Sequence, residues 1–75
     1  MKILLRMYKS TIHRNKPWRF EVHINGVAQV ESIRRYSTKR EVAASGRLVA
    51  GTMGHFEEEL GRYAMEAIDV ETEID

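Results

Sequence analysis

Side chains that could catalyse a reaction or bind a metal are few in this chain of 75 residues, and their spacing fits no catalytic or metal motif. The lack of cysteine excludes disulfides, thiolate zinc sites and cysteine nucleophiles. His13, His23 and His55 have no second ligand at helical spacing, and consecutive glutamates at 57–59 would point to different faces of a helix. No serine has an accompanying base and orienting group, and no glycine pattern fits a phosphate-binding loop. We therefore expect no enzyme, no metal and no cofactor.

The basic side chains form the one unusual pattern. The formal net charge is only +1, but residues 1–40 hold ten Lys and Arg against two Glu, whereas residues 41–75 hold two Arg against nine Asp and Glu. A basic sheet face with an aromatic side chain suits nucleic acid, because Lys and Arg neutralise phosphates and release counterions. The residues expected to bind nucleic acid are Arg6, Tyr8, Arg14, Lys16, Arg19, His23, Arg34, Arg35, Lys39 and Arg40. The acidic half could instead face a basic protein partner.

Three strands are expected to position these side chains. Alternation of apolar residues predicts strands near 2–9 and 18–25, with the apolar residues of the second strand on one face and Arg19, Glu21 and His23 on the other. Asn25-Gly26 predicts a hairpin turn, since both residues accept positive φ. The third strand, 27–36, alternates poorly. A two-residue loop would place Val27 opposite Ile24, a three-residue loop would place the next residue there, and a β-bulge near 31–32 would bring the later apolar residues into step.

A long helix is expected to follow the third strand. Thr38-Lys39-Arg40-Glu41 has the pattern of a capping box, which predicts a helix start. Apolar residues then recur at spacings of three and four, which predicts one helix over 38–66 with a continuous seam. Glycines at 51 and 54 favour the alternative of two helices with a bend. The seam residues expected to form a dimer or partner interface are Val49, Met53, Phe56, Leu60 and Tyr63.

Small residues recur every fourth position at Gly46, Ala50 and Gly54. This stripe indicates either a close contact between two helices or a helix that lies close on a sheet. The last eight residues alternate between apolar and acidic side chains, which is typical of a strand with an acidic outer face or of a solvated tail.

Several short motifs resemble one repeat of the YegP-like family of small uncharacterised proteins. They are Tyr8-Lys9-Ser10, Trp18-Arg19-Phe20, Asn25-Gly26, Ser32, Tyr36-Ser37-Thr38-Lys39 and Ala44. The resemblance covers roughly residues 7–50 and implies a three-stranded antiparallel sheet packed on a helix, a dimer of single units, and no established activity. The chain departs from that pattern by one extra residue between Ser32 and Tyr36 and by its long acidic C-terminal extension.

A second resemblance is to the arm-type DNA-binding domain of phage integrases. It rests on Trp18-Arg19, Asn25-Gly26 and Thr38-Lys39-Arg40-Glu41. It implies a three-stranded sheet plus helix whose exposed sheet face contacts DNA, with Arg6, Arg19, His23 and Arg34 among the contacts.

The fold expected from these patterns is α+β: a three-stranded antiparallel β-meander packed on a long C-terminal helix, possibly with a short acidic strand or tail. Residues 1–75 would form one domain, with the basic sheet at 1–36, the helix at 37–67 and the acidic tail at 68–75.

The expected function is a small non-enzymatic module that binds nucleic acid through the exposed sheet face. The alternative is a homodimeric interaction or inhibitor protein of phage or mobile-element type. With no apolar run long enough for a membrane span and no signal-peptide pattern, we expect a cytoplasmic protein without a small-molecule substrate.

Overall fold

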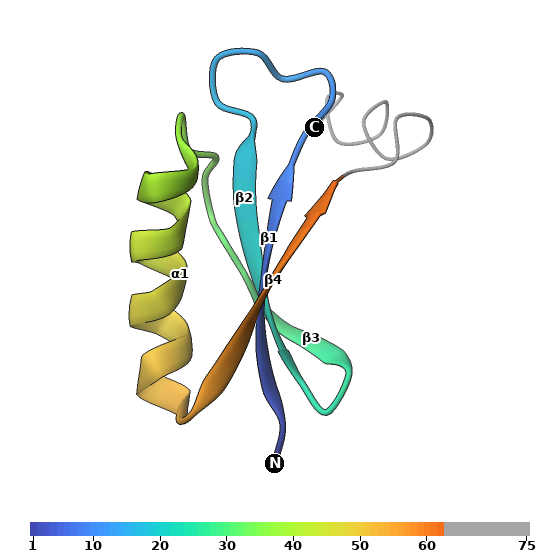
Figure 1. Ribbon diagram of the computed structural model, residues 1–75, viewed down its shortest axis with the longest axis vertical. Helices are drawn as coiled ribbons and strands as arrows, with labels where there is room; N and C mark the ends of the chain where they lie inside the picture. Colours follow the sequence, from blue (N-terminus) through green and yellow to red (C-terminus); the bar gives the residue numbers. More distant parts are fainter. Residues whose placement is uncertain (63–75) are drawn as a thin grey trace.

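One helix and a four-stranded sheet form two layers in residues 1–62, the part of the chain that this computed structural model describes (Figure 1). The elements are β1 (Ile3–Lys9), β2 (Trp18–Ile24), β3 (Val27–Glu31), α1 (Lys39–Met53) and β4 (Phe56–Arg62). The strand order is β3-β2-β1-β4, with β1 antiparallel to β2 and parallel to β4. The α+β class and the antiparallel meander are confirmed. The prediction of a C-terminal helix is wrong, because α1 lies between β3 and β4 in the chain.

The hairpin between β2 and β3 has the two-residue loop. Asn25 and Gly26 both have positive φ, at 51° and 86°, and Ile24 pairs with Val27. Both residues accept this conformation at little cost, as the type of turn requires. A β-bulge is also present, but it lies at Gln29 rather than near 31–32: Val30 pairs with Val22, and Ala28 with His23.

The third strand ends at Glu31, five residues earlier than predicted. Ser32 continues the contact with β2, since its N–H donates to the Phe20 carbonyl oxygen at 2.9 Å and its hydroxyl accepts from the Phe20 N–H at 3.2 Å. The backbones of Trp18 and Tyr36 then exchange two hydrogen bonds, of 3.0 and 2.7 Å. Residues 33–35 loop out between these two contacts, which places two arginines on a connection instead of a strand.

The helix begins as predicted and ends much earlier. The Thr38 hydroxyl accepts from the Glu41 N–H at 3.1 Å, and the Glu41 carboxylate accepts from the Thr38 N–H at 3.2 Å, which confirms the capping box. The helix stops at Met53 because Gly54 adopts a φ of 142°, a conformation that other residues rarely reach. The chain then turns into β4, so Phe56 and Leu60 lie in a strand and the predicted helix over 38–66 is wrong. Tyr63 and the tail at 68–75 lie outside the described residues.

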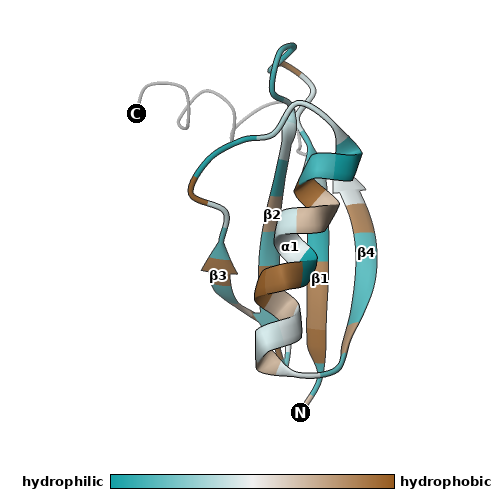
Figure 2. Ribbon diagram, turned by 90° about the vertical axis from the view of Figure 1, so that its left-hand side faces the viewer, coloured by the Kyte–Doolittle hydropathy of each residue, from teal (hydrophilic) through white to brown (hydrophobic). Residues whose placement is uncertain are grey.

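The core lies between α1 and the two central strands. Leu5, Met7, Val22 and Val42 are the largest fully buried side chains. Gly46 allows the helix to approach closely, since a Cβ on it would lie 2.7 Å from Leu5 Cδ1. Of the two alternatives for the small-residue stripe, the helix that lies close on a sheet is therefore the one present. Gly46 and Ala50 form this contact, and Gly54 lies past the helix end. Figure 2 shows α1 in front of β1 and β2, with β3 and β4 extending on either side of it.

Candidate nucleic-acid interface

The open face of the sheet holds four of the predicted nucleic-acid contacts, and Glu21 of β2 lies among them. The Tyr8 hydroxyl donates to Glu21 Oε1 at 3.4 Å, and His23 Nε2 lies 2.8 Å from the same oxygen. The Arg19 guanidinium forms an ion pair with the other carboxylate oxygen of Glu21. Arg6 Nη2 lies 2.8 Å from Glu59 Oε2 of β4. The cations of this face are therefore engaged with carboxylates of the same face.

Two further observations describe the electrostatics of the open face. The guanidinium carbons of Arg6 and Arg19 lie 5.3 and 5.8 Å from the centroid of the Tyr8 ring, so the ring contacts two cations. Burial raises the pKa of the Tyr8 hydroxyl above its ordinary value, and the charge of Glu21 raises it further. Glu21 was expected on this face, whereas the glutamates of β4 were not, because the pattern of that segment predicted a helix.

Most of the chain's cations gather instead at one end of the two-layer fold, which we call the basic end. The connection 10–17, the connection 32–38, the start of α1 and the last residues of β1 and β4 all meet there (Figure 1). These segments supply eight of the twelve Lys and Arg of the chain and one carboxylate, Glu41, which caps the helix. The cations of the basic end are Lys9, Arg14, Lys16, Arg34, Arg35, Lys39, Arg40 and Arg62.

The connection 10–17 is fixed at its base by one buried polar residue, Ser10. The Ser10 N–H donates to the Pro17 carbonyl oxygen at 2.7 Å, which closes the loop. The Ser10 hydroxyl accepts from the N–H groups of Ile12 and His13, each at 3.2 Å. These bonds hold the first half of the loop in one turn, and the exposed Arg14 and Lys16 follow directly after it.

Two aromatic rings lie among the cations. The Arg34 guanidinium carbon lies 5.2 Å from the centroid of the Tyr36 ring, and Lys9 Nζ lies 6.0 Å from that of Trp18. Lys9 pairs with Trp18 on one side and with Arg62 on the other, so the three residues form a row across the ends of β2, β1 and β4. This row was not predicted, because Arg62 joins it only through the parallel pairing of β4 with β1.

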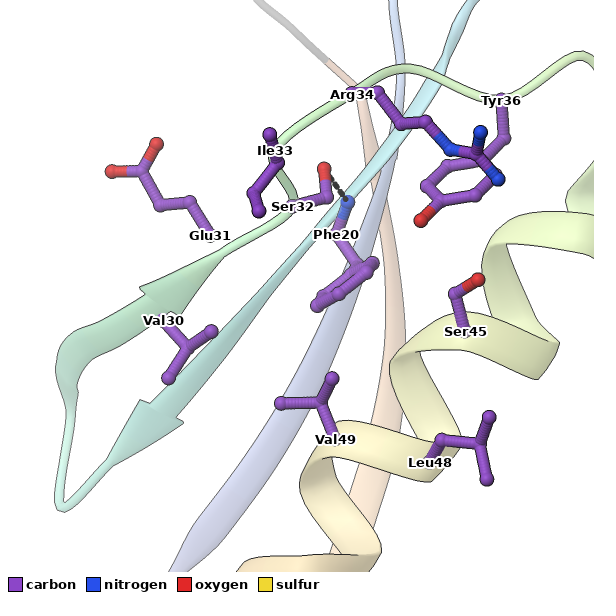
Figure 3. Close-up of a pocket in the computed structure, with 10 residues that line it drawn as sticks. All are labelled: Phe20, Val30, Glu31, Ser32, Ile33, Arg34, Tyr36, Ser45, Leu48 and Val49. Carbon is purple, nitrogen blue, oxygen red and sulfur yellow. Dashed lines mark hydrogen bonds between the residues drawn. The ribbon is translucent and has the colours of Figure 1, made fainter.

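An apolar groove opens between α1 and β3. It has a volume of about 500 Å³, and Figure 3 shows the side chains around it. Its lining residues are Phe20, Val30, Glu31, Ser32, Ile33, Arg34, Tyr36, Ser45, Leu48 and Val49. The groove exists because α1 covers the central strands and leaves the edge strand β3 bare. Ile33 and Leu48 are among the most exposed large apolar side chains of residues 1–62.

The predicted interface seam is divided between two elements. Val49 and Met53 lie in α1 and pack against the core, and Phe56 packs there from β4. Leu60 lies in β4 and is 54% exposed. The four described residues therefore form no continuous helical surface, because the helix ends between Met53 and Phe56.

Within residues 1–62, no three His, Asp or Glu side chains gather in a way that could hold a metal ion. The single helix of that part of the chain is also too short and too polar to cross a membrane. Comparison with protein-family models, with curated proteins and with solved structures found no match. The resemblances to the YegP-like family and to the integrase arm-type domain stay predictions.

Proposed function

We propose that this protein is a small non-enzymatic module that binds nucleic acid through its basic end. The supporting observation is that, among residues 1–62, eight cations and one carboxylate gather where two connections, the helix start and two strand ends meet. Such a cluster attracts the phosphate backbone and gains affinity from released counterions. The open sheet face is a poorer phosphate site, since its arginines already contact carboxylates.

The position of Lys39 and Arg40 also supports this proposal. They occupy the first turn of α1, where the helix dipole favours negative charge. Two cations at this position cost the helix stability. Residues that reduce local stability are typical of a functional surface. Here, phosphate would supply the negative charge that the helix start favours.

Two charge-matched double variants test the location of the interface. Arg14→Gln/Lys16→Gln removes two cations from the basic end, whereas Arg6→Gln/Arg47→Gln removes two cations from elsewhere. Fluorescence anisotropy with a labelled oligonucleotide should show that the first variant binds roughly tenfold more weakly than the wild type. The second should bind within about twofold of it, because each of its arginines contacts a glutamate. Equal losses in the two variants would contradict the proposal.

A second candidate function is self-association through the apolar groove. Ile33 stands fully exposed beside a groove lined by Val30, Leu48 and Val49. A two-fold contact needs a protrusion and a recess on the same surface, since each copy must fill the other. Glu31 and Arg34 lie at the same groove, so opposite charges can meet across such a contact. The partner that this surface fits is a second copy of the chain.

Sedimentation at micromolar concentration tests the second candidate. The wild type should sediment as a dimer and Ile33→Asp as a monomer, because a buried unpaired carboxylate opposes association. Leu60→Asp serves as the matched control, since Leu60 is an exposed apolar residue on the opposite sheet edge. It should remain a dimer. A monomeric wild type, or a dimer lost only in Leu60→Asp, would contradict association through the groove.

A further inference from the structure

We propose that the row Lys9–Trp18–Arg62 is a stacking site for one unpaired base of a nucleic acid. The ring of Trp18 would contact the base, and Lys9 and Arg62 would contact the neighbouring phosphates. This inference rests on the proposed function, because it names the form of nucleic acid that the basic end prefers. The stacking site gives Trp18 a role in binding that the attraction between charges does not require.

The geometry of the row places the indole ring beside two cations, with Lys9 between Trp18 and Arg62. Lys9 lies at the end of β1, and both of its neighbours across the sheet contribute to the row. An open cavity of about 420 Å³ lies over it, lined by Lys9, Trp18, Leu60, Gly61 and Arg62. The cavity wall therefore combines an indole ring, an apolar side chain and two cations.

The cavity is open because α1 does not extend over it. The helix covers β1 and β2, and Leu60 of the edge strand β4 stays 54% exposed. A Cβ added to Gly61 would point to the opposite sheet face, where it would lie 3.2 Å from the Tyr8 ring. Leu60 and Trp18 both expose apolar surface to this cavity. A base that covers this surface removes it from water, which favours binding.

The Trp18 ring is suited to stacking because it is already fixed. Trp18 packs against the core, and its backbone exchanges two hydrogen bonds with Tyr36. A ring held in place loses little entropy when a base stacks on it. Stacking on an aromatic side chain adds affinity for each base that it contacts and needs a free base face. Bases in a duplex have their faces covered by their neighbours, so the site favours unpaired nucleotides.

The fluorescence of the protein itself tests the site, because Trp18 is the only tryptophan of the chain. The full chain is titrated with oligo(dT), with oligo(U), with a duplex of equal length and with inorganic polyphosphate. Both single strands should quench the tryptophan emission on binding, and their relative affinities show whether the strand is preferred as DNA or RNA. The duplex should bind with much less quenching, and polyphosphate with none, since neither presents a free base face.

Variants provide a second, independent measurement by anisotropy with labelled oligo(dT). Trp18→Phe keeps an aromatic ring and should bind within about threefold of the wild type. Trp18→Leu should lose about tenfold in affinity for the single strand and should keep its affinity for the duplex. If Trp18→Leu does not fold, the wild-type fluorescence decides the question alone.

The outcomes separate this inference from the proposed function. Binding of single strands without quenching, or with quenching equal to that caused by the duplex, would overturn the stacking site and leave the basic end as a phosphate-binding surface. If none of the four polyanions binds at low salt, the proposed function fails and the stacking site fails with it.

Discussion

Two glycines of α1 have the same residue type and opposite surroundings. Gly46 faces the sheet, where an added Cβ would lie 2.7 Å from Leu5 Cδ1 and 3.3 Å from Phe20 Cγ. Gly51 is exposed, and an added Cβ there would contact no atom within 4 Å. The first glycine is required for packing. The second only weakens the helix, since glycine is a poor helix former.

Substitution at these two positions should therefore change stability in opposite directions. Gly51→Ala should raise the free energy of unfolding by about 1 kcal/mol, because alanine favours the helix. Gly46→Leu should lower it by about 2 kcal/mol, because the new side chain overfills the contact with β1 and β2. Urea unfolding of both variants provides the measurement. A Gly46→Leu protein as stable as the wild type would show that the helix does not lie as close to the sheet as described.

Tyr8 makes the stability of the fold depend on alkaline pH. Burial and Glu21 raise the pKa of Tyr8 in the folded protein, so the unfolded chain releases this proton first as the pH rises. The contribution of Tyr8 is fully present below its unfolded pKa of about 10 and is lost as the pH rises through the folded pKa. Tyr8→Phe should show a smaller loss of thermal stability than the wild type above about pH 10. Identical alkaline profiles would contradict this account of Tyr8.

At the scale of the elements, the start of α1 combines a feature that stabilises the helix with one that destabilises it. The capping box satisfies the N–H groups of Thr38 and Glu41, whereas Lys39 and Arg40 place positive charge at the positive end of the helix dipole. The capping box belongs to the fold, and the two cations belong to the proposed interface.

The variant Lys39→Gln/Arg40→Gln should separate stability from binding. Glutamine resembles lysine and arginine in helix propensity, so the change isolates charge. Thermal unfolding should show a stability gain of about 1 kcal/mol, since two unfavourable charges leave the helix start. Anisotropy should show weaker binding of nucleic acid by the same variant. If stability and binding both fall, the two cations support the fold and are not an interface.

β4 is the element that the sequence did not reveal. Phe56 and Leu60 are four residues apart, a spacing that suits a helix as well as two positions of one strand face. Its neighbour is β1, more than forty residues earlier in the chain, so the pairing is not a local property. Once the strand forms, its three glutamates mark an exposed edge with charge, which discourages pairing with another sheet. Glu58 also ties the strand to α1, since Arg47 donates to it at 2.6 and 2.9 Å.

The elements that depend on short sequence motifs could be predicted from the sequence. The Asn25-Gly26 turn, the alternation in β2 and the capping box at Thr38 each depend on residues within six positions of one another. The helix end was harder to predict, because Gly54 could either bend a helix or end it. The end of β3 depends on Ser32 and Tyr36 meeting β2, which is a tertiary contact.

At the scale of the whole molecule, the charge pattern of the sequence has a different meaning in three dimensions. The excess of cations in residues 1–40 predicted a basic sheet face. The fold instead brings carboxylates onto that face and collects the cations of both connections at one end. Arg14, Lys16, Lys39 and Arg40 were predicted from their charge and keep their place in the proposed site. Arg62 was not, because its proximity to Lys9 depends on β4.

The dependence of nucleic-acid affinity on salt tests the basic end most directly. The logarithm of the wild-type association constant should fall steeply and linearly with the logarithm of salt concentration, because binding releases counterions from phosphates. Lys39→Gln/Arg40→Gln should reduce the slope by about two, one for each lost phosphate contact. Arg6→Gln/Arg47→Gln, with the same net charge, should leave the slope unchanged. A slope that both variants reduce equally, or a wild type that binds no nucleic acid at low salt, would contradict the account.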